Sequence, residues 1–169
     1  FSDDGSMALA IADAYITQGR FCGSTIQQNF IDWAETGVFG TRPGQPAWDI
    51  GNTVQRSLKA VRNIQRPYAG STMADTSANG CIMRLAPCII WNRNNLSAAI
   101  GESVAQALLT HGSSDCITYT AALAHELWEG RSLPQYDHLR DRPINNSGYV
   151  ADTYASAWYS VKRTNSFHA

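Results

Sequence analysis

The sequence predicts an all-α protein, a compact bundle of about seven helices in orthogonal packing, joined by long loops. Three observations predict this fold class. Apolar residues recur at helical spacing through most of the chain, glycines follow several of these stretches as terminators, and no stretch alternates well enough to form a strand.

The first helix is predicted over residues 6–18, where apolar residues lie on nearly every face and Gly19 follows as the terminator. Such a helix is expected at the centre of the bundle, buried by its neighbours. The second helix, residues 24–36, has Ser24 as its expected N-cap and Gly37 as its terminator.

Two loops flank the next helix. Residues 37–52 carry four glycines and two prolines, and we expect Trp48 to anchor this loop. Residues 53–63 form an amphipathic pattern typical of a helix, and residues 66–78 are small and polar. Loops of the latter kind hold binding groups more often than core.

The stretch 77–91 begins Ser-Ala-Asn-Gly and contains Pro87. Its Asn-Gly pair is typical of hairpin turns, but no alternating strands flank it, so a helix start fits better. The N–H groups of a helix N-terminus would bind phosphate there, with Ser77 and Asn79 adding side-chain hydrogen bonds. An ordinary capped helix with a kink at Pro87 is the alternative.

Two amphipathic helices follow, at residues 97–110 and 115–129, the second with Ser114 as its expected cap. His125 opens a His-Glu pattern that is similar to the start of a zinc-protease motif, but the second histidine is absent, which excludes that class. His125 is expected to be a surface or half-buried helix residue.

Residues 133–147 are charged and contain proline, which predicts an exposed loop, and residues 148–163 form the last complete helical pattern. Asn165 or Ser166 is typical of an N-cap. We therefore expect another helix to begin there, and the natural protein to be longer.

Composition favours one domain over residues 1–169. The 44% hydrophobic fraction and five tryptophans exclude disorder, and a net charge of −1 gives no reason to expect nucleic-acid or membrane binding. No apolar run is long enough for a membrane span. We expect a cytoplasmic monomer with reduced core thiols at its four cysteines, which are Cys22, Cys81, Cys88 and Cys116.

The chain opens with a hydroxyl and two carboxylates, Ser2, Asp3 and Asp4, directly before the first helical pattern. Such oxygen ligands suit a hard divalent cation, magnesium or manganese better than zinc. The alternative is that Ser2 or Asp3 caps the helix and Asp4 complements its dipole.

His111 follows the end of one predicted helix and precedes the cap of the next. A histidine at such a rim can reach a ligand, although lone histidines are more often structural. Both interpretations remain open from the residues alone.

Four stretches stand in one order: Ser2-Asp3-Asp4, then Ser-Ala-Asn-Gly with Met83 and Arg84, then Thr110-His111, then residues 148–153. This ordered set resembles the ADP-ribosylglycohydrolase family, which includes the dinitrogenase reductase activating glycohydrolases. The resemblance spans nearly the whole chain. It implies an all-α fold that holds two magnesium or manganese ions and hydrolyses the bond between ADP-ribose and a protein side chain.

The resemblance also implies roles for particular residues. Asp3 and Asp4 match the catalytic aspartates and, with Ser2, the metal ligands, while Gly5 replaces a threonine of the family. The implied partner is an ADP-ribosylated protein or ADP-ribose. The residues that the resemblance implies to bind the diphosphate and ribose are Thr76, Ser77, Asn79, Gly80 and His111, with Met83 and Arg84 supporting them. Tyr149 is implied to stack on the adenine.

Two motifs of the family are absent from this sequence, an upstream Gly-Asp-Ala-x-Gly helix and a downstream Gly-Gly-Asp-Thr-Asp-Thr ligand motif. Two aspartates and a serine are too few ligands for two hard cations. A non-catalytic ADP-ribose-binding or structural member of the same fold is therefore the main alternative to a hydrolase. An unrelated helical interaction domain would leave the ordered motifs unexplained.

Overall fold

The computed structural model describes residues 2–64 and 66–164, and within these residues it is helical with no strand, only two isolated bridges. The all-α prediction is confirmed. The α-helices are α1 (Asp3–Gln18), α2 (Gly23–Thr36), α3 (Asn52–Ile64), α4 (Ala86–Trp91), α5 (Leu96–Leu108), α6 (Ser114–Glu129), α7 (Asp137–Arg140) and α8 (Val150–Lys162). Short 3₁₀ turns are η1 (Ala74–Thr76), η2 (Asn79–Cys81) and η3 (Pro134–Tyr136).

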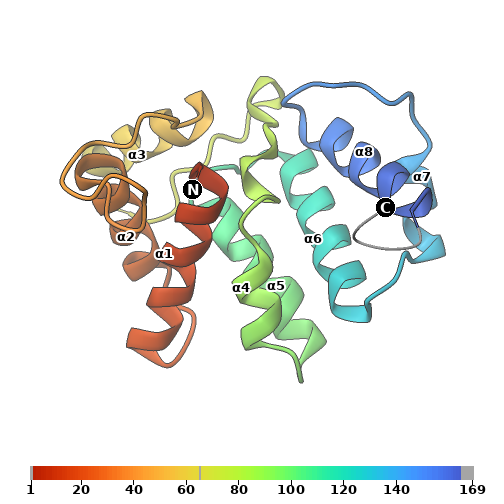
Figure 1. Ribbon diagram of the computed structural model, residues 1–169, viewed down its shortest axis with the longest axis horizontal. Helices are drawn as coiled ribbons and strands as arrows, with labels where there is room; N and C mark the ends of the chain where they lie inside the picture. The colour runs from red at the N-terminus through yellow and green to blue at the C-terminus, as the bar shows by residue number, and fades with distance from the viewer. Residues whose placement is uncertain (1, 65, 165–169) are drawn as a thin grey trace.

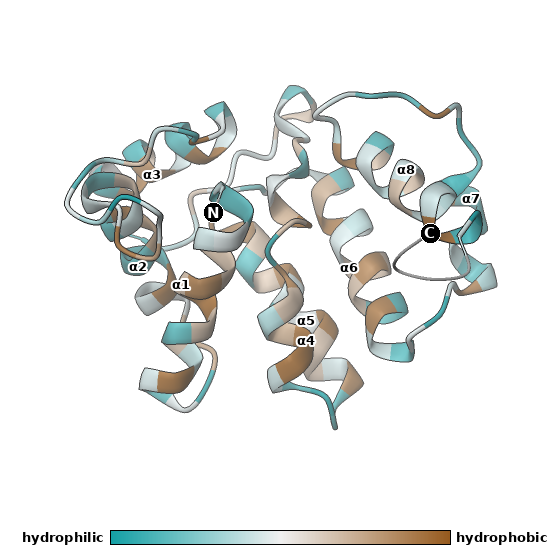
Figure 2. Ribbon diagram, viewed as in Figure 1, coloured by the Kyte–Doolittle hydropathy of each residue, from teal (hydrophilic) through white to brown (hydrophobic). Residues whose placement is uncertain are grey.

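The helices form two groups on either side of α4 and α5. Helices α1, α2 and α3 lie on one side, and α6, α7 and α8 lie on the other (Figure 1). Each group has its own cluster of buried apolar residues. Hydrophilic residues concentrate in the outer loops and at helix ends, while the central helices are more hydrophobic (Figure 2).

Helix α1 occupies the expected central place but keeps one open face. Met7 and Ile11 are fully buried against the neighbouring helices, whereas Ile16 is 76% exposed. The helix begins at Asp3, three residues earlier than predicted from the sequence, so the acidic pair forms its first turn. Ser2 occupies the N-cap position, but its side chain contacts Asp4 rather than capping the helix.

Arg84 joins helices α1 and α2 to the central helix α5. It is fully buried, and its guanidinium lies 4.5 Å from the centre of the Phe30 ring on α2. It donates hydrogen bonds to the Gln106 side chain on α5 and to the Thr110 hydroxyl, at 2.8 and 2.6 Å. A further contact reaches Met7 Sδ on α1. One side chain therefore fixes α1, α2 and α5 relative to one another.

Two predicted caps are shifted along the chain. The residue at the N-cap of α2 is Cys22 rather than Ser24, and Ser24 instead lies in the first turn beside the Cys22 thiol. The cap of α6 is Ser113 rather than Ser114, because the Ser113 hydroxyl accepts the Cys116 N–H at 3.3 Å. With two adjacent serines, the pattern alone does not decide which one caps.

The stretch 77–91 is not one helix. It forms the 3₁₀ turn η2 and then α4, so no long helix begins at Ser77. Pro87 lies in the first turn of α4, where proline needs no N–H partner, and it produces no kink.

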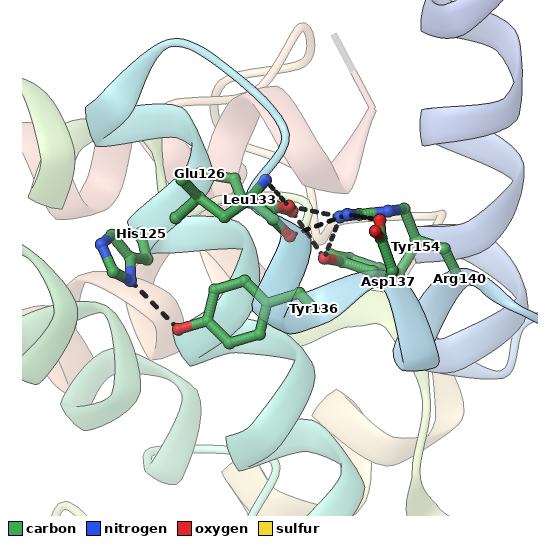
Figure 3. A network of polar contacts seen from close by, with 7 residues as sticks. All are labelled: His125, Glu126, Leu133, Tyr136, Asp137, Arg140 and Tyr154. Atoms are coloured by element: carbon green, nitrogen blue, oxygen red, sulfur yellow. Dashed lines mark hydrogen bonds and ion pairs between the residues drawn. The ribbon is translucent and has the colours of Figure 1, made fainter.

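Residues 133–147 are also more ordered than the predicted loop, because they contain η3 and α7. Arg140 forms ion pairs with Glu126 of α6 and with Asp137, and it donates to Tyr154 Oη of α8 at 3.2 Å (Figure 3). Tyr154 Oη donates to the fully buried Glu126 at 2.5 Å. This network fastens α7 between α6 and α8.

Four smaller expectations can be compared with the structure. Cys81, Cys88 and Cys116 are buried free thiols as expected, whereas Cys22 is only half-buried. His125 is half-buried as expected. Trp48 does not anchor its loop, because it is 69% exposed. The helix expected from Asn165 or Ser166 lies outside the described residues.

Within the described ranges, none of the helices combines the length and the apolar character that crossing a bilayer requires.

Candidate functional site

A cavity of about 640 Å³ opens where the ends of several helices converge. This volume lies in the range that binds nucleotide-sized ligands. Its walls come from the first turn of α1, the start of α3, the segment before η2, the end of α5 and the start of α8. The lining residues are Asp3, Gly51, Asn52, Thr53, Val54, Arg56, Ala74, Asp75, Ser77, Ala78, Asn79, Gly80, Met83, His111, Gly148 and Tyr149.

The acidic end of the cavity is the first turn of α1. The Asp3 side chain lines the cavity and is half-buried, while Ser2 and Asp4 are exposed beside it. Burial, together with the Asp4 and Asp49 carboxylates, raises the pKa of Asp3 above its usual range. The negative charges of Asp4 and Asp49 thus act on the Asp3 carboxyl at this end.

The start of α3 also lines the cavity, which the sequence did not predict. Gln55 N–H donates to Gly51 C=O at 2.9 Å, which places Asn52, Thr53 and Val54 in the first turn. The N–H groups of a first turn have no acceptor within their own helix, and the helix dipole makes them favour an anion. The available signal was the Gly-Asn-Thr stretch at the predicted boundary between the loop 37–52 and the helix 53–63, to which we had assigned no binding role.

The segment 77–80 is fixed by backbone pairing with the start of α8. Asn79 N–H donates to Gly148 C=O, and Val150 N–H donates to Ser77 C=O, both at 2.9 Å. These bonds form the antiparallel bridge between Ala78 and Tyr149. Residues 77–80 and Tyr149, far apart in the sequence, therefore line the same cavity.

The polar side chains of this segment are used within the protein. Ser77 Oγ donates to Ser113 Oγ at 2.9 Å, and Asn79 Nδ2 donates to Thr153 Oγ1 at 3.1 Å. The expected side-chain donors are thus engaged with α6 and α8. What they contribute is the position of the backbone around the cavity.

A close backbone crossing positions His111. Gly70 N–H donates to Leu108 C=O at 3.1 Å, and Gly112 N–H donates to Ser71 C=O at 2.9 Å. A Cβ on Gly70 would lie 2.6 Å from the backbone nitrogen of His111, and a Cβ on Gly112 would lie 2.6 Å from the backbone oxygen of Gly70. Only glycine allows the two segments to approach this closely.

The imidazole of His111 is buried, with an exposed fraction of 1%, yet it lines the cavity. Its Nδ1 lies 2.7 Å from Thr110 Oγ1, and its Nε2 has no hydrogen-bond partner among the described residues. Burial and the nearby Arg84 guanidinium lower the pKa of His111 to about 3. The ring is therefore neutral at physiological pH.

Tyr149 also lines the cavity. Its hydroxyl donates to Asp115 Oδ2 at 2.8 Å, and the Arg142 guanidinium lies 5.1 Å from the centre of its ring. Arg142 in turn pairs with Asp152 at 2.8 Å and does not line the cavity. Asp115 thus accepts the hydroxyl hydrogen bond and Arg142 contacts the ring, and neither residue lines the cavity.

The cavity therefore brings together seven of the residues singled out from the sequence, which are Asp3, Ser77, Asn79, Gly80, Met83, His111 and Tyr149. Ser2 and Asp4 lie beside it without lining it. Thr76 belongs to a neighbouring cavity, and its hydroxyl donates to Met73 C=O at 2.6 Å.

Comparison with known proteins defines the family to which this helical fold belongs. A family model described as ADP-ribosylglycohydrolase matches residues 1–169. The chain belongs to the ADP-ribosylglycohydrolase family.

Two curated relatives also match nearly the whole chain. The chain is 32% identical over 194 residues to a Pseudomonas putida (strain GB-1) protein named ADP-ribosylarginine hydrolase Tri1, covering 99% of the chain and 51% of that protein. A Serratia proteamaculans (strain 568) protein of the same name is 28% identical over 191 residues, covering 99% of the chain and 52% of that protein. The chain thus spans about half the length of these relatives.

A solved structure has the same fold. It is described as an ADP-ribosylglycohydrolase-related protein complex and matches with a TM-score of 0.77 at 23% identity, covering 99% of this chain and 61% of that one. This similarity supports the fold assignment.

Proposed function

We propose that this chain carries the ADP-ribose site of a hydrolase that removes ADP-ribose from modified protein side chains. The observation that carries the proposal is that one cavity joins the acidic first turn of α1 to His111 and the start of α3. Family membership and the printed name of the curated relatives support the same activity.

The cavity suits each part of ADP-ribose. The first turn of α3 and His111 are proposed to hold the diphosphate, because both offer groups suited to an anion. Tyr149 is proposed to stack on adenine, since an aromatic face suits a purine. Ser77, Asn79 and Gly80 shape the wall between them, and Thr76 supports that wall through its bond to Met73.

The distal ribose is proposed to lie at Asp3, which lines the same cavity. Asp3 and Asp4 are proposed as the catalytic residues, with one carboxylate orienting or deprotonating the attacking water. The water oxygen bonds to the anomeric carbon while the bond from that carbon to the side-chain nitrogen breaks. The departing nitrogen keeps the electron pair of that bond and takes up a proton.

The donor set of the acidic end fits a hard cation in kind. Ser2, Asp3 and Asp4 offer a hydroxyl and two carboxylates, the oxygen ligands that magnesium and manganese prefer. We propose that these residues hold one or both of a pair of such ions, together with further ligands. When bound, such a cation lowers the pKa of its water and stabilises negative charge.

Arginine is the modified side chain that we propose first, because both curated relatives are named ADP-ribosylarginine hydrolases. The activity, the protein substrate and any other partner belong to the whole protein, of which this chain corresponds to about half the length of its relatives.

The test is the Asp4→Asn variant, assayed for release of ADP-ribose from an ADP-ribosylated arginine peptide. This substitution keeps the shape of an exposed side chain and removes its charge. We expect turnover to be lost, about 10²-fold or more, while thermal unfolding changes little. Turnover at the wild-type rate would refute the assignment of Asp4.

A second candidate is a non-catalytic member that binds ADP-ribose. It is favoured by one observation: within residues 2–64 and 66–164, no group of three or more His, Cys, Asp or Glu side chains is placed to hold a metal ion. Calorimetry with ADP-ribose distinguishes the two, because the binding module would bind the nucleotide without hydrolysing any modified peptide.

A further inference from the structure

The proton of the neutral His111 ring can lie on either of its two nitrogens. Its two ring nitrogens have different surroundings, since Nδ1 lies 2.7 Å from Thr110 Oγ1 and Nε2 has no partner among the described residues. A neutral imidazole has one N–H and one acceptor nitrogen, so the neighbours of Nδ1 decide which nitrogen carries the proton.

Arg84 settles the direction of the hydrogen bonds. A guanidinium only donates, and Arg84 Nη2 donates to Thr110 Oγ1 at 2.6 Å. The Thr110 hydroxyl accepts this bond, and its own proton is left to be donated. The acceptor within reach of it is His111 Nδ1.

The opposite arrangement would leave a buried donor without an acceptor. If Nδ1 carried the proton, Thr110 Oγ1 would accept from both Arg84 and His111, and its hydroxyl proton would have no other partner in the described part of the chain. Thr110 is fully buried, so water does not supply one at its surface. An unsatisfied buried donor costs about 1–3 kcal/mol.

We propose that Arg84 and Thr110 are positioning residues that fix His111 as a neutral donor, with its proton on Nε2 and available to an oxygen of the bound nucleotide. The proposal rests on the proposed function for the identity of that nucleotide. It assigns a task to the Arg84 side chain beyond packing, because the chain of bonds runs from Arg84 through Thr110 to the cavity.

The position of Nε2 indicates which oxygen it meets. A Cβ built on Gly80 would lie 3.1 Å from Nε2 and 3.7 Å from a methyl group of Val54, so Gly80 of η2 lies close both to the ring and to the first turn of α3. His111 and the first turn of α3 line the same cavity, and the N–H groups that they offer favour a diphosphate oxygen.

The first test uses the free protein and needs no ligand. Nitrogen-15 NMR of the histidine side chains reports directly which ring nitrogen carries the proton. In the wild type we expect the His111 proton on Nε2, and in Thr110→Val, which removes the hydroxyl, a mixture of both tautomers. Thr110→Ser keeps the hydroxyl and should restore the wild-type pattern. A proton on Nδ1 in the wild type would overturn the proposal.

The second test measures ADP-ribose affinity by calorimetry. We expect Thr110→Val to weaken binding about 5-fold to 10-fold, which corresponds to about one hydrogen bond, and Thr110→Ser to stay within about twofold. His125→Gln, a change outside the cavity, is the control. Wild-type affinity in Thr110→Val would contradict the inferred role.

The two tests separate the inference from the proposed function. If the wild type binds no ADP-ribose, the proposed function fails, while the NMR result still decides the tautomer of His111. Arg84 itself is a poor choice for substitution, because it is buried and contacts three helices.

Discussion

At the scale of single residues, His111 shows why a lone histidine is hard to interpret from sequence. Its place after a predicted helix suggested a rim position, which fits both a ligand contact and a structural role. The structure shows a buried ring that lines the cavity, with one nitrogen 2.7 Å from Thr110 Oγ1 and the other without a partner among the described residues. That difference depends on the Gly70 and Gly112 crossing, which no local pattern indicates.

Burial of His111 predicts an acid-sensitive fold. Its pKa is lowered from 6.5 to about 3, so over this range the unfolded chain binds a proton that the folded chain does not. Stability therefore falls as pH falls from 6.5 toward 3, by up to about 1.4 kcal/mol per pH unit from this residue. Urea unfolding at several pH values measures the slope.

The His111→Gln variant lacks the titrating ring, so the free energy of unfolding should depend less steeply on pH in this range. The control is His138→Gln, which changes an exposed histidine of α7. It should keep the wild-type slope. Equal slopes in His111→Gln and the wild type would show that the ring is not held neutral by burial.

Gly80 is required for space rather than for backbone conformation. An added Cβ would lie 2.8 Å from His111 Cε1, closer than real Cβ contacts allow. Overpacking of this kind costs about 1–3 kcal/mol, and here the imidazole is the group that must move. We expect Gly80→Ala to weaken ADP-ribose binding about tenfold or more in a calorimetric titration.

Gly101→Ala is the matched control, because a Cβ at this α5 position meets nothing within 4 Å. Alanine is also the better helix former, by up to about 1 kcal/mol, so this variant should be at least as stable as the wild type. If Gly80→Ala binds ADP-ribose as Gly101→Ala does, the position of His111 does not matter for the ligand.

At the scale of helices and loops, most of the long elements were predictable from sequence. Apolar spacing located α1, α2, α3, α5, α6 and α8 to within a few residues at each end. The short elements were missed. Helix α7 has only four residues, too few for periodicity, and it depends on the tertiary contacts of Arg140.

The Glu126 network therefore makes a prediction about how α6, α7 and α8 hold together. Glu126 is fully buried, and its removal leaves Arg140 without its buried partner. We expect Glu126→Gln to lower the free energy of unfolding by about 3 kcal/mol or more, measured in urea. The reason is that the buried Arg140 side chain keeps only an exposed carboxylate partner, Asp137.

The comparison variant is Glu129→Gln at the end of the same helix. Glu129 pairs with Arg131, whose side chain is 64% exposed, and such surface pairs contribute about 0–1 kcal/mol. A loss of similar size in the two variants would mean that the Glu126 network does not stabilise this part of the fold.

At the scale of the whole molecule, the sequence identified most of the cavity but not its assembly. Asp3, Asn79, His111 and Tyr149 were singled out separately, and the structure places them in one cavity. The start of α3 was predicted to within one residue, but its place in the cavity was not, because no binding motif marks the Gly-Asn-Thr stretch. Convergence of helix ends follows from tertiary packing around Arg84, which a local pattern does not encode.

The central claim is that this cavity belongs to an enzyme that releases ADP-ribose. The most direct measurement is release of free ADP-ribose from arginine-modified and serine-modified peptides, with magnesium, manganese or EDTA. It compares this chain with a version extended at both ends to the length of its curated relatives. We predict metal-dependent release from the arginine peptide by the extended version, lost in EDTA. No release from either peptide by either version would contradict the hydrolase account.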